Sequence, residues 1–148
     1  MLTIGKKLKA LKIARPTLLL DKDRVALNIK RMKEKADRAG VPFRPHFKTH
    51  QSAQVGKWFQ RMGVHSITVS SLDMGIYFAD HGWKDITVAF TANLLEKKAL
   101  QSLSRKVALS LLVDSVELVR GLASLLTAKA RVWIDVDVGY HRTGIPWD

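Results

Sequence analysis

The sequence predicts an α/β fold, namely part of a (β/α)8 TIM-like barrel. Short β-like runs alternate with helical segments, and glycines mark several of the returns, which is typical of parallel strands joined by right-handed crossovers. Two of the runs, 86–90 and 107–113, are almost entirely apolar, as strands buried on both faces are. No Gly-x-Gly-x-x-Gly follows any run, so the dinucleotide-binding form of a doubly wound sheet loses its main support.

The individual elements follow from periodicity and stop signals. A helix is predicted over 23–39, because Val25, Ile29 and Met32 form part of an apolar stripe at helical spacing and Gly40 is a natural stop. The other predicted helices cover 52–62, 72–81, 94–104 and 115–127. The predicted strands cover 17–21, 43–48, 66–70, 86–90, 107–113 and 131–138. A closed barrel takes about 250 residues and eight strands, so this set predicts an incomplete barrel.

Composition narrows the classes of function. The chain has 148 residues, no cysteine and a net charge of +12. Disulfide and thiolate chemistry are therefore excluded, and no apolar run is long enough for a membrane helix. Residues 1–15 are predicted to be a basic amino-terminal helix or tail rather than a secretory signal, because lysines interrupt their apolar positions. A cytoplasmic location with no membrane partner is the expectation.

The high positive charge has two interpretations. It suits an acidic partner such as nucleic acid, or it reflects lysines and arginines that solvate the outer faces of helices. The basic residues are spread over several predicted helices without interleaved aromatics, whereas a surface for single-stranded nucleic acid stacks bases on aromatic rings. The expectation is therefore that nucleic acid is not a partner, with a basic nucleic-acid-binding module kept as an alternative.

Cationic side chains are concentrated in the predicted strand 43–48 and just after it. If this stretch is extended, Arg44, His46, Lys48 and His50 share one face, because side chains alternate along a strand. Several such groups are costly to bury without an anion, which a phosphorylated cofactor or a substrate carboxylate would supply. Pro45 favours the alternative of an exposed edge strand with a basic face. The residues alone leave both interpretations open.

A second polar cluster follows the last predicted strand. Asp135 and Asp137 lie one pleat apart on the same face, where they either ligate a metal or pair with basic groups on neighbouring strands. Arg142 follows in a loop flanked by glycines. This loop lies beyond the carboxyl end of the strand, which is where barrel active sites form. Arg142 is therefore a candidate site residue, with a solvated loop arginine as the alternative.

Two segments and their spacing carry a resemblance to a known family. Residues 44–50 read Arg-Pro-His-Phe-Lys-Thr-His, and residues 135–144 read Asp-Val-Asp-Val-Gly-Tyr-His-Arg-Thr-Gly. The first resembles the cofactor-lysine motif of the D-threonine aldolase and D-serine dehydratase group, which is related to the amino-terminal barrel of alanine racemase. The second resembles the Asp-Val-Gly-x-x-Arg-x-Gly segment of that group. Runs between these motifs and at 16–21 agree in order, so the resemblance covers about residues 16–145.

The resemblance implies a fold-type III pyridoxal-phosphate domain over residues 16–148. Lys48 would hold pyridoxal 5'-phosphate covalently and later act as a base on the substrate. His46 and His50 would flank the lysine and tune it, and Arg44 counts with them among the cofactor-binding residues. Arg142 would contact the cofactor region or the substrate carboxylate. The run 17–21 would belong to a second β domain, which leaves about five of the eight barrel strands in this chain.

The same resemblance implies a lyase acting on D-3-hydroxy amino acids. Cleavage of Cα–Cβ would make it an aldolase, and loss of the β-hydroxyl would make it a dehydratase. The family's phosphate-binding loops, its divalent-metal ligands and its β domain fall beyond residue 148, so no metal ligand is expected here and the fragment is expected to be inactive. The alternative is a non-catalytic barrel remnant. Open sheet edges invite association, so a homo-oligomer is expected.

Overall fold

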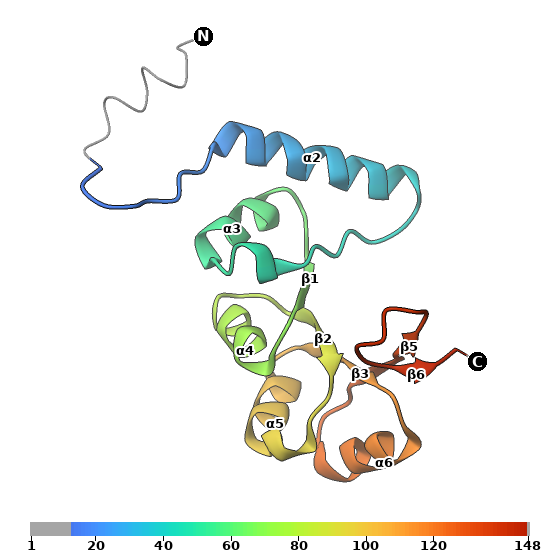
Figure 1. The fold of residues 1–148 in the computed structure, drawn as a ribbon. Coiled ribbons are helices and arrows are strands. Elements are labelled where there is room, and N and C mark those ends of the chain that lie inside the picture. Colours follow the sequence, from blue (N-terminus) through green and yellow to red (C-terminus); the bar gives the residue numbers. More distant parts are fainter. Residues whose placement is uncertain (1–12, 148) are drawn as a thin grey trace.

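Helices and strands alternate along the chain as the sequence predicts, in a computed structural model that describes residues 13–147 (Figure 1). The α-helices are α2 (Lys22–Arg38), α3 (Ala53–Arg61), α4 (Leu72–Asp80), α5 (Lys97–Lys106) and α6 (Val116–Leu125). The 3₁₀ turns are η1 (Phe47–Thr49) and η2 (Leu94–Glu96). The strands are β1 (Ser66–Val69), β2 (Asp85–Thr91), β3 (Ala108–Val113), β4 (Arg131–Ile134), β5 (Val136–Asp137) and β6 (Ile145–Pro146).

Four of the α-helices begin after a side-chain cap. The side-chain oxygens of Asp21, Ser52, Ser71 and Ser115 each accept a hydrogen bond from the backbone N–H three residues on. This bond satisfies one of the free N–H groups at the start of α2, α3, α4 and α6, respectively. The caps explain why these helices start where they do.

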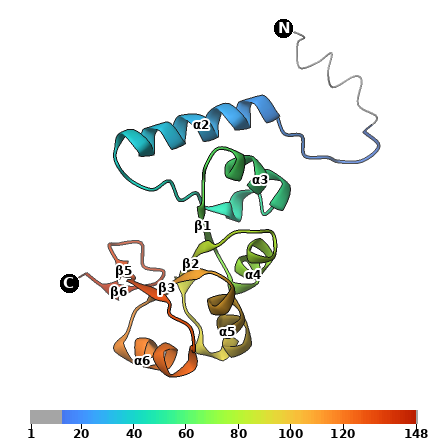
Figure 2. The same ribbon diagram turned by 180° about the vertical axis from the view of Figure 1, so that it is seen from behind.

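The central sheet is parallel and has the order β1-β2-β3-β4. An isolated parallel bridge between His46 and Thr68 places the segment ending at His46 beside β1. This segment occupies the position of a first barrel strand. Helices α3 to α6 are arranged around one side of the strands (Figures 1 and 2). The chain therefore has the α/β architecture of a partial TIM-like barrel.

The two faces of the sheet have different chemistry. On the face covered by helices, Ile67, Ile86 and Leu109 are almost completely buried within one apolar cluster. The opposite face, here called the inner face, carries polar side chains because strand residues alternate between faces. One register row on the inner face runs through His46, Thr68, Thr87, Ser110 and Arg131. The core therefore lies between sheet and helices, and the inner face is polar.

Three of the predicted strands are wrong in extent. Residues 17–21 form no strand, because no neighbouring strand in the described part of the chain pairs with them and an unpaired strand leaves its backbone groups unsatisfied. The run 43–48 ends as a strand at His46 and continues into η1. The run 131–138 divides at Asp135, after which β5 pairs with β6 instead of continuing the sheet.

Two further expectations concern the amino-terminal region and membranes. Of the predicted basic helix or tail, residues 1–12 lie outside the described residues, and 13–15 are not helical. Among residues 13–147 no helix combines the length and apolar character that a membrane crossing requires.

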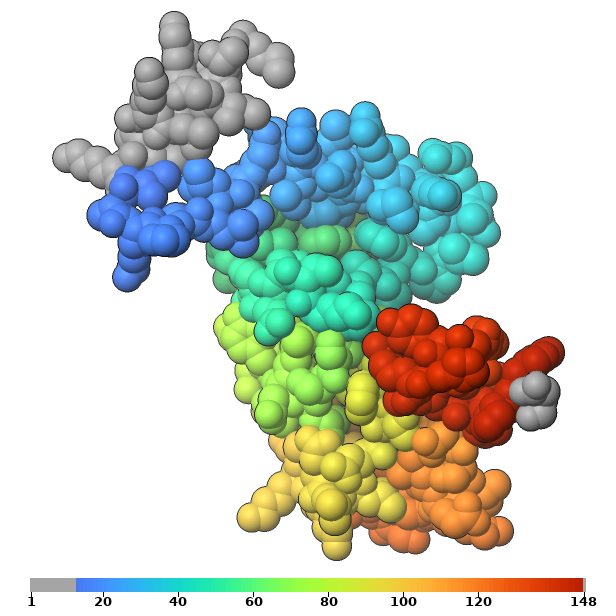
Figure 3. All heavy atoms as spheres, in the orientation of Figure 1, coloured from blue at the N-terminus to red at the C-terminus, as the bar shows by residue number. Residues whose placement is uncertain are grey.

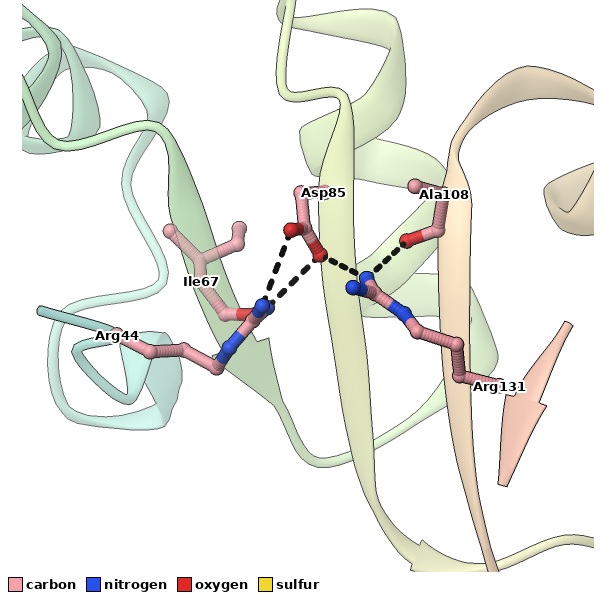
Figure 4. A network of polar contacts seen from close by, with 5 residues as sticks. All are labelled: Arg44, Ile67, Asp85, Ala108 and Arg131. Atoms are coloured by element: carbon pink, nitrogen blue, oxygen red, sulfur yellow. Dashed lines mark hydrogen bonds and ion pairs between the residues drawn. The ribbon is translucent and has the colours of Figure 1, made fainter. Parts of the chain in front are cut away.

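A single carboxylate joins strands that are not neighbours in the sheet. Arg44 donates to both oxygens of Asp85 at 3.0 and 3.1 Å, and Arg131 donates to the Oδ1 atom at 2.6 Å (Figure 4). Arg44 also donates to the Ile67 carbonyl, and Arg131 to the Ala108 carbonyl. Burial raises the pKa of Asp85, but the hydrogen bonds and charges of the two arginines outweigh burial and lower it below its usual value.

Replacing this carboxylate is expected to destabilise the sheet. Asp85→Asn should reduce the free energy of unfolding by about 1–2 kcal/mol, the range for charged hydrogen bonds reduced for partial exposure. Because the folded-state pKa of Asp85 is lowered, its contribution should be present above the unfolded pKa of about 3.9 and be lost as the pH falls through the folded pKa. Urea unfolding between pH 7 and pH 3 measures both effects.

The control is Asp80→Asn, because Asp80 pairs with Lys106 in a more exposed salt bridge. This variant should lose less than about 0.5 kcal/mol. Equal losses for the two variants, or an Asp85 effect that persists at pH 3, would contradict the structural role of Asp85.

Candidate active site

Lys48 lies at the edge of the sheet where the parallel strands end. It belongs to η1, which directly follows the segment bridged to β1 through His46. Its side chain is exposed, whereas the preceding residue, Phe47, is completely buried. Phe47 packs edge-on against Phe78 and Trp83 at ring-centroid distances of 5.0 Å. The backbone that carries the exposed amine is therefore anchored by a buried aromatic side chain.

His46 is the site residue most directly coupled to Lys48. Its Nδ1 atom accepts a hydrogen bond from the Lys48 backbone N–H at 3.2 Å, which caps η1. An accepting Nδ1 requires the neutral ring to carry its proton on Nε2. Burial, and second the positive charge of Lys48, lower the pKa of His46 below the usual histidine value. His46 is therefore held neutral beside the lysine.

His50 lies in a different environment from the one the sequence predicts. Its ring packs against Phe47 at 4.4 Å and stacks on Phe59 at 5.9 Å between ring centroids. The Nδ1 atom accepts a hydrogen bond from the Ser52 N–H, while the buried Nε2 atom has no hydrogen-bond partner. Burial lowers the pKa of His50. Its contacts place His50 in the aromatic layer beneath the helices.

Arg44 lies at the opposite end of the strands from Lys48. Its partner Asp85 is the first residue of β2, so the pair marks the amino edge of the sheet. Arg44 and His46 share the inner face, as the alternation predicts, but η1 turns the chain before Lys48 and His50. The structure therefore does not bring Arg44, His46, Lys48 and His50 together in one row.

The loop that carries Arg142 is organised by the Asp137 side chain. Its Oδ1 atom accepts hydrogen bonds from the backbone N–H groups of Gly139, Tyr140 and His141 at 3.0, 2.8 and 3.0 Å. These bonds, with the His141 N–H first, lower the pKa of Asp137 below its usual value, although desolvation acts in the opposite direction. The Arg142 guanidinium is exposed and lies 5.2 Å from the centroid of the Tyr140 ring.

Tight backbone packing closes the same loop. Gly144 has a φ of +104°, and a Cβ atom there would lie 2.8 Å from the Asp137 backbone nitrogen. Figure 3 shows the carboxyl-terminal segment, coloured red, as a lobe beside the middle of the chain. Asp135 precedes the lobe and has a buried Oδ2 atom without a hydrogen-bond partner. The prediction that Asp135 and Asp137 pair with basic groups on neighbouring strands is therefore wrong. The Asp137 carboxylate instead accepts hydrogen bonds from the backbone of its own loop.

The role of Asp85 was not among the sequence-based predictions. A carboxylate at the start of an otherwise apolar strand is the signal that could have found it, since such a residue needs a cationic partner if it is partly buried. The metal alternative for the aspartates finds no support in geometry. Within residues 13–147, no three His, Asp or Glu side chains gather as a metal site requires.

Comparison with known proteins identifies the family. Residues 20–148 match the family described as alanine racemase, N-terminal domain. The chain belongs to this family. This family membership confirms the resemblance derived from residues 44–50 and 135–144, and it confirms the predicted fold class.

Within this family, the chain is similar to enzymes of D-amino acid metabolism. D-threo-3-hydroxyaspartate dehydratase of Delftia sp. (strain HT23) is 36% identical over 137 residues, which are 90% of this chain and 36% of the relative. D-threonine aldolase of Arthrobacter sp and D-serine dehydratase of Dictyostelium discoideum are each 28% identical, covering 90% and 87% of this chain and 36% of each relative. The Delftia dehydratase structure matches with a TM-score of 0.81 at 34% identity, over 91% of this chain and 37% of that structure. The chain thus spans about a third of these relatives' length.

The proximity of Lys48 to His46 gives a prediction for titration in solution. Lys48→Gln should raise the pKa of His46, because removing a nearby positive charge favours the protonated ring. The pKa of His50 should stay where it is, since burial alone lowers it. Two-dimensional NMR of the imidazole resonances between pH 4 and pH 8 measures both. Unchanged titration of His46, or equal shifts in the two rings, would show that the Lys48 amine is not beside His46.

Proposed function

We propose that this alanine racemase N-terminal domain binds pyridoxal 5'-phosphate through Lys48 and contributes to the active site of a lyase for D-3-hydroxy amino acids. The observation that carries the proposal is the position of Lys48: an exposed amine on an anchored turn at the carboxyl edge of a parallel sheet. Active sites of such barrels form at this edge. The lysine also lies within the motif that the sequence shares with the family.

The residues present fit the cofactor in part. An exposed amine is accessible to an aldehyde, and Phe47 fixes the backbone beside it. Arg142 offers an exposed cationic group in the loop that follows β4 and β5. This loop leaves the sheet at the same edge as Lys48. When bound, pyridoxal phosphate supplies an electron sink that stabilises negative charge on the substrate α-carbon. Lys48 and Arg142 are the residues that would hold the cofactor and the substrate carboxylate.

The protein's own groups then have separate tasks. Lys48 would hold the cofactor and would move a proton at the substrate α-carbon. His46 is neutral, and its Nδ1 atom accepts a hydrogen bond from the Lys48 backbone N–H, so it positions the lysine without adding a competing positive charge. Arg142 orients the substrate carboxylate through its guanidinium, which is suited to bidentate pairing. His50 supports the turn from the aromatic layer.

The proposed substrate class rests on the similar proteins. Two of them are named as dehydratases, of D-threo-3-hydroxyaspartate and of D-serine, and the third is named as D-threonine aldolase. These amino acids share the D configuration and a hydroxyl on the β-carbon. Because the chain spans 36% of each relative, we further propose that it binds the cofactor but needs additional polypeptide for turnover.

Covalent trapping tests the cofactor proposal without requiring activity. The full chain is incubated with pyridoxal 5'-phosphate, reduced with borohydride, and analysed by intact mass and peptide mapping. A single adduct on Lys48 is expected, because its amine is exposed next to a neutral histidine. Lys48→Ala should remove the adduct.

The matched control is Lys57→Ala, which removes an exposed lysine on α3 and should label like the parent. Labelling scattered over many lysines, or undiminished in Lys48→Ala, would overturn the proposal. It would favour a barrel remnant without a specific cofactor site.

A further inference from the structure

The Arg44, Asp85 and Arg131 side chains form most of one layer inside the barrel. In (β/α)8 barrels, an interior layer consists of four side chains contributed by alternate strands. The order here is the segment ending at His46, then β1, β2, β3 and β4. Arg44 comes from the first position, Asp85 from the third and Arg131 from the fifth. The strands between them, β1 and β3, contribute the carbonyls of Ile67 and Ala108 (Figure 4).

This layer has an excess of positive charge and of hydrogen-bond donors. Two guanidinium groups share the one carboxylate of Asp85, and both of its oxygens already accept hydrogen bonds. Arg131 makes its hydrogen bonds through Nη2 alone, to Asp85 and Ala108. Its side chain is 53% exposed, and its Nη1 and Nε groups have no acceptor within residues 13–147. The layer therefore lacks one acceptor and one negative charge.

Covering the inner face would make this imbalance costly. A buried guanidinium without a compensating anion loses its hydration and gains nothing in return. An apolar or basic residue in the fourth position of the layer would leave that charge uncompensated. A carboxylate there would accept from Arg131 and bring the layer to neutrality, with two positive and two negative groups.

A second copy of this chain does not fit the inner face. In a twofold-symmetric pair the same surface meets itself, so a face with excess positive charge would meet a face with the same excess. Like charges brought together in this way oppose association. The buried hydroxyls of Thr87 and Ser110, which also lack partners on this face, do not change its net charge. Charge complementarity therefore selects an acidic occupant.

We propose that the inner face is covered by a polypeptide strand that places an Asp or Glu carboxylate against Arg131, at the level of Asp85. The proposal concerns the surface that completes the barrel and does not rest on cofactor binding at Lys48. It assigns Arg131 as an interface residue and gives the covering strand a defined chemistry. This chain matches 36% of the Delftia relative, so the remaining polypeptide of that relative is a source in which such a strand can be sought.

The test uses the full chain and, as the probe, the part of Delftia D-threo-3-hydroxyaspartate dehydratase that this chain does not match, expressed as a separate polypeptide. Binding is measured by titration calorimetry or co-purification. Arg131→Glu should weaken the complex at least tenfold, and Arg131→Lys should weaken it less. The control Lys129→Glu makes the same charge change at an exposed position just before β4 and should change affinity less than threefold. Circular dichroism of each variant checks that it folds.

A double-mutant cycle then locates the carboxylate. Each Asp and Glu of the probe's strand segments is changed singly to its amide and titrated against the parent chain and against Arg131→Met. One carboxylate should show at least tenfold coupling to Arg131. The proposal is overturned if no complex forms, if Arg131→Glu binds as tightly as the parent, or if no single carboxylate couples to Arg131. Stable dimers of the parent chain formed through Arg131 would likewise overturn it, in favour of a second copy.

Discussion

The sharing of one carboxylate between two arginines is the interaction on which the arrangement of this protein depends. Asp85 connects the segment before Lys48, the middle of the sheet and the strand that leads to the Arg142 loop. These parts are far apart in sequence, and they are not adjacent in the sheet. Because both arginines also bind backbone carbonyls of the intervening strands, the network fixes register as well as distance. The two candidate site segments therefore take their relative position from contacts at the opposite edge of the sheet.

The second constraint is the different chemistry of the two faces of the sheet. The helix face is apolar and closed, and it supplies the core from which Phe47 holds η1 in place. The inner face is polar and carries His46 at the end near Lys48. One short turn thus has a buried anchor and an exposed amine as neighbours. This alternation of buried and exposed positions is what gives a lysine on the surface a defined location.

Local sequence patterns predicted much of this fold, because helix periodicity, caps and apolar runs are local properties. The helices over 23–39 and 115–127 and the strands at 66–70 and 107–113 were recovered within a few residues. The differences arise where a distant partner decides the structure, or where a cap that periodicity does not reveal turns the chain. Residues 17–21 lack a pairing strand, and η1 forms where an extended run was expected because His46 caps it. The pairing of Arg44 with Asp85, which lies 41 positions away, has no local signal either. The assignment of Arg44 to the cofactor residues stays a prediction. The roles of Lys48 and Arg142 came from resemblance to a family, not from periodicity.

The Asp137 side chain has a consequence for how the Arg142 loop behaves. A carboxylate that gathers three consecutive N–H groups within four residues closes the loop with its own atoms. The conformational entropy of the loop is therefore lost when the chain folds and not when a ligand binds. The backbone beside Arg142 is preorganised in this way, so an anion that bound there, as proposed above, would meet a loop that is already in place. Substitutions elsewhere in the sheet should consequently leave the shape of this loop largely intact.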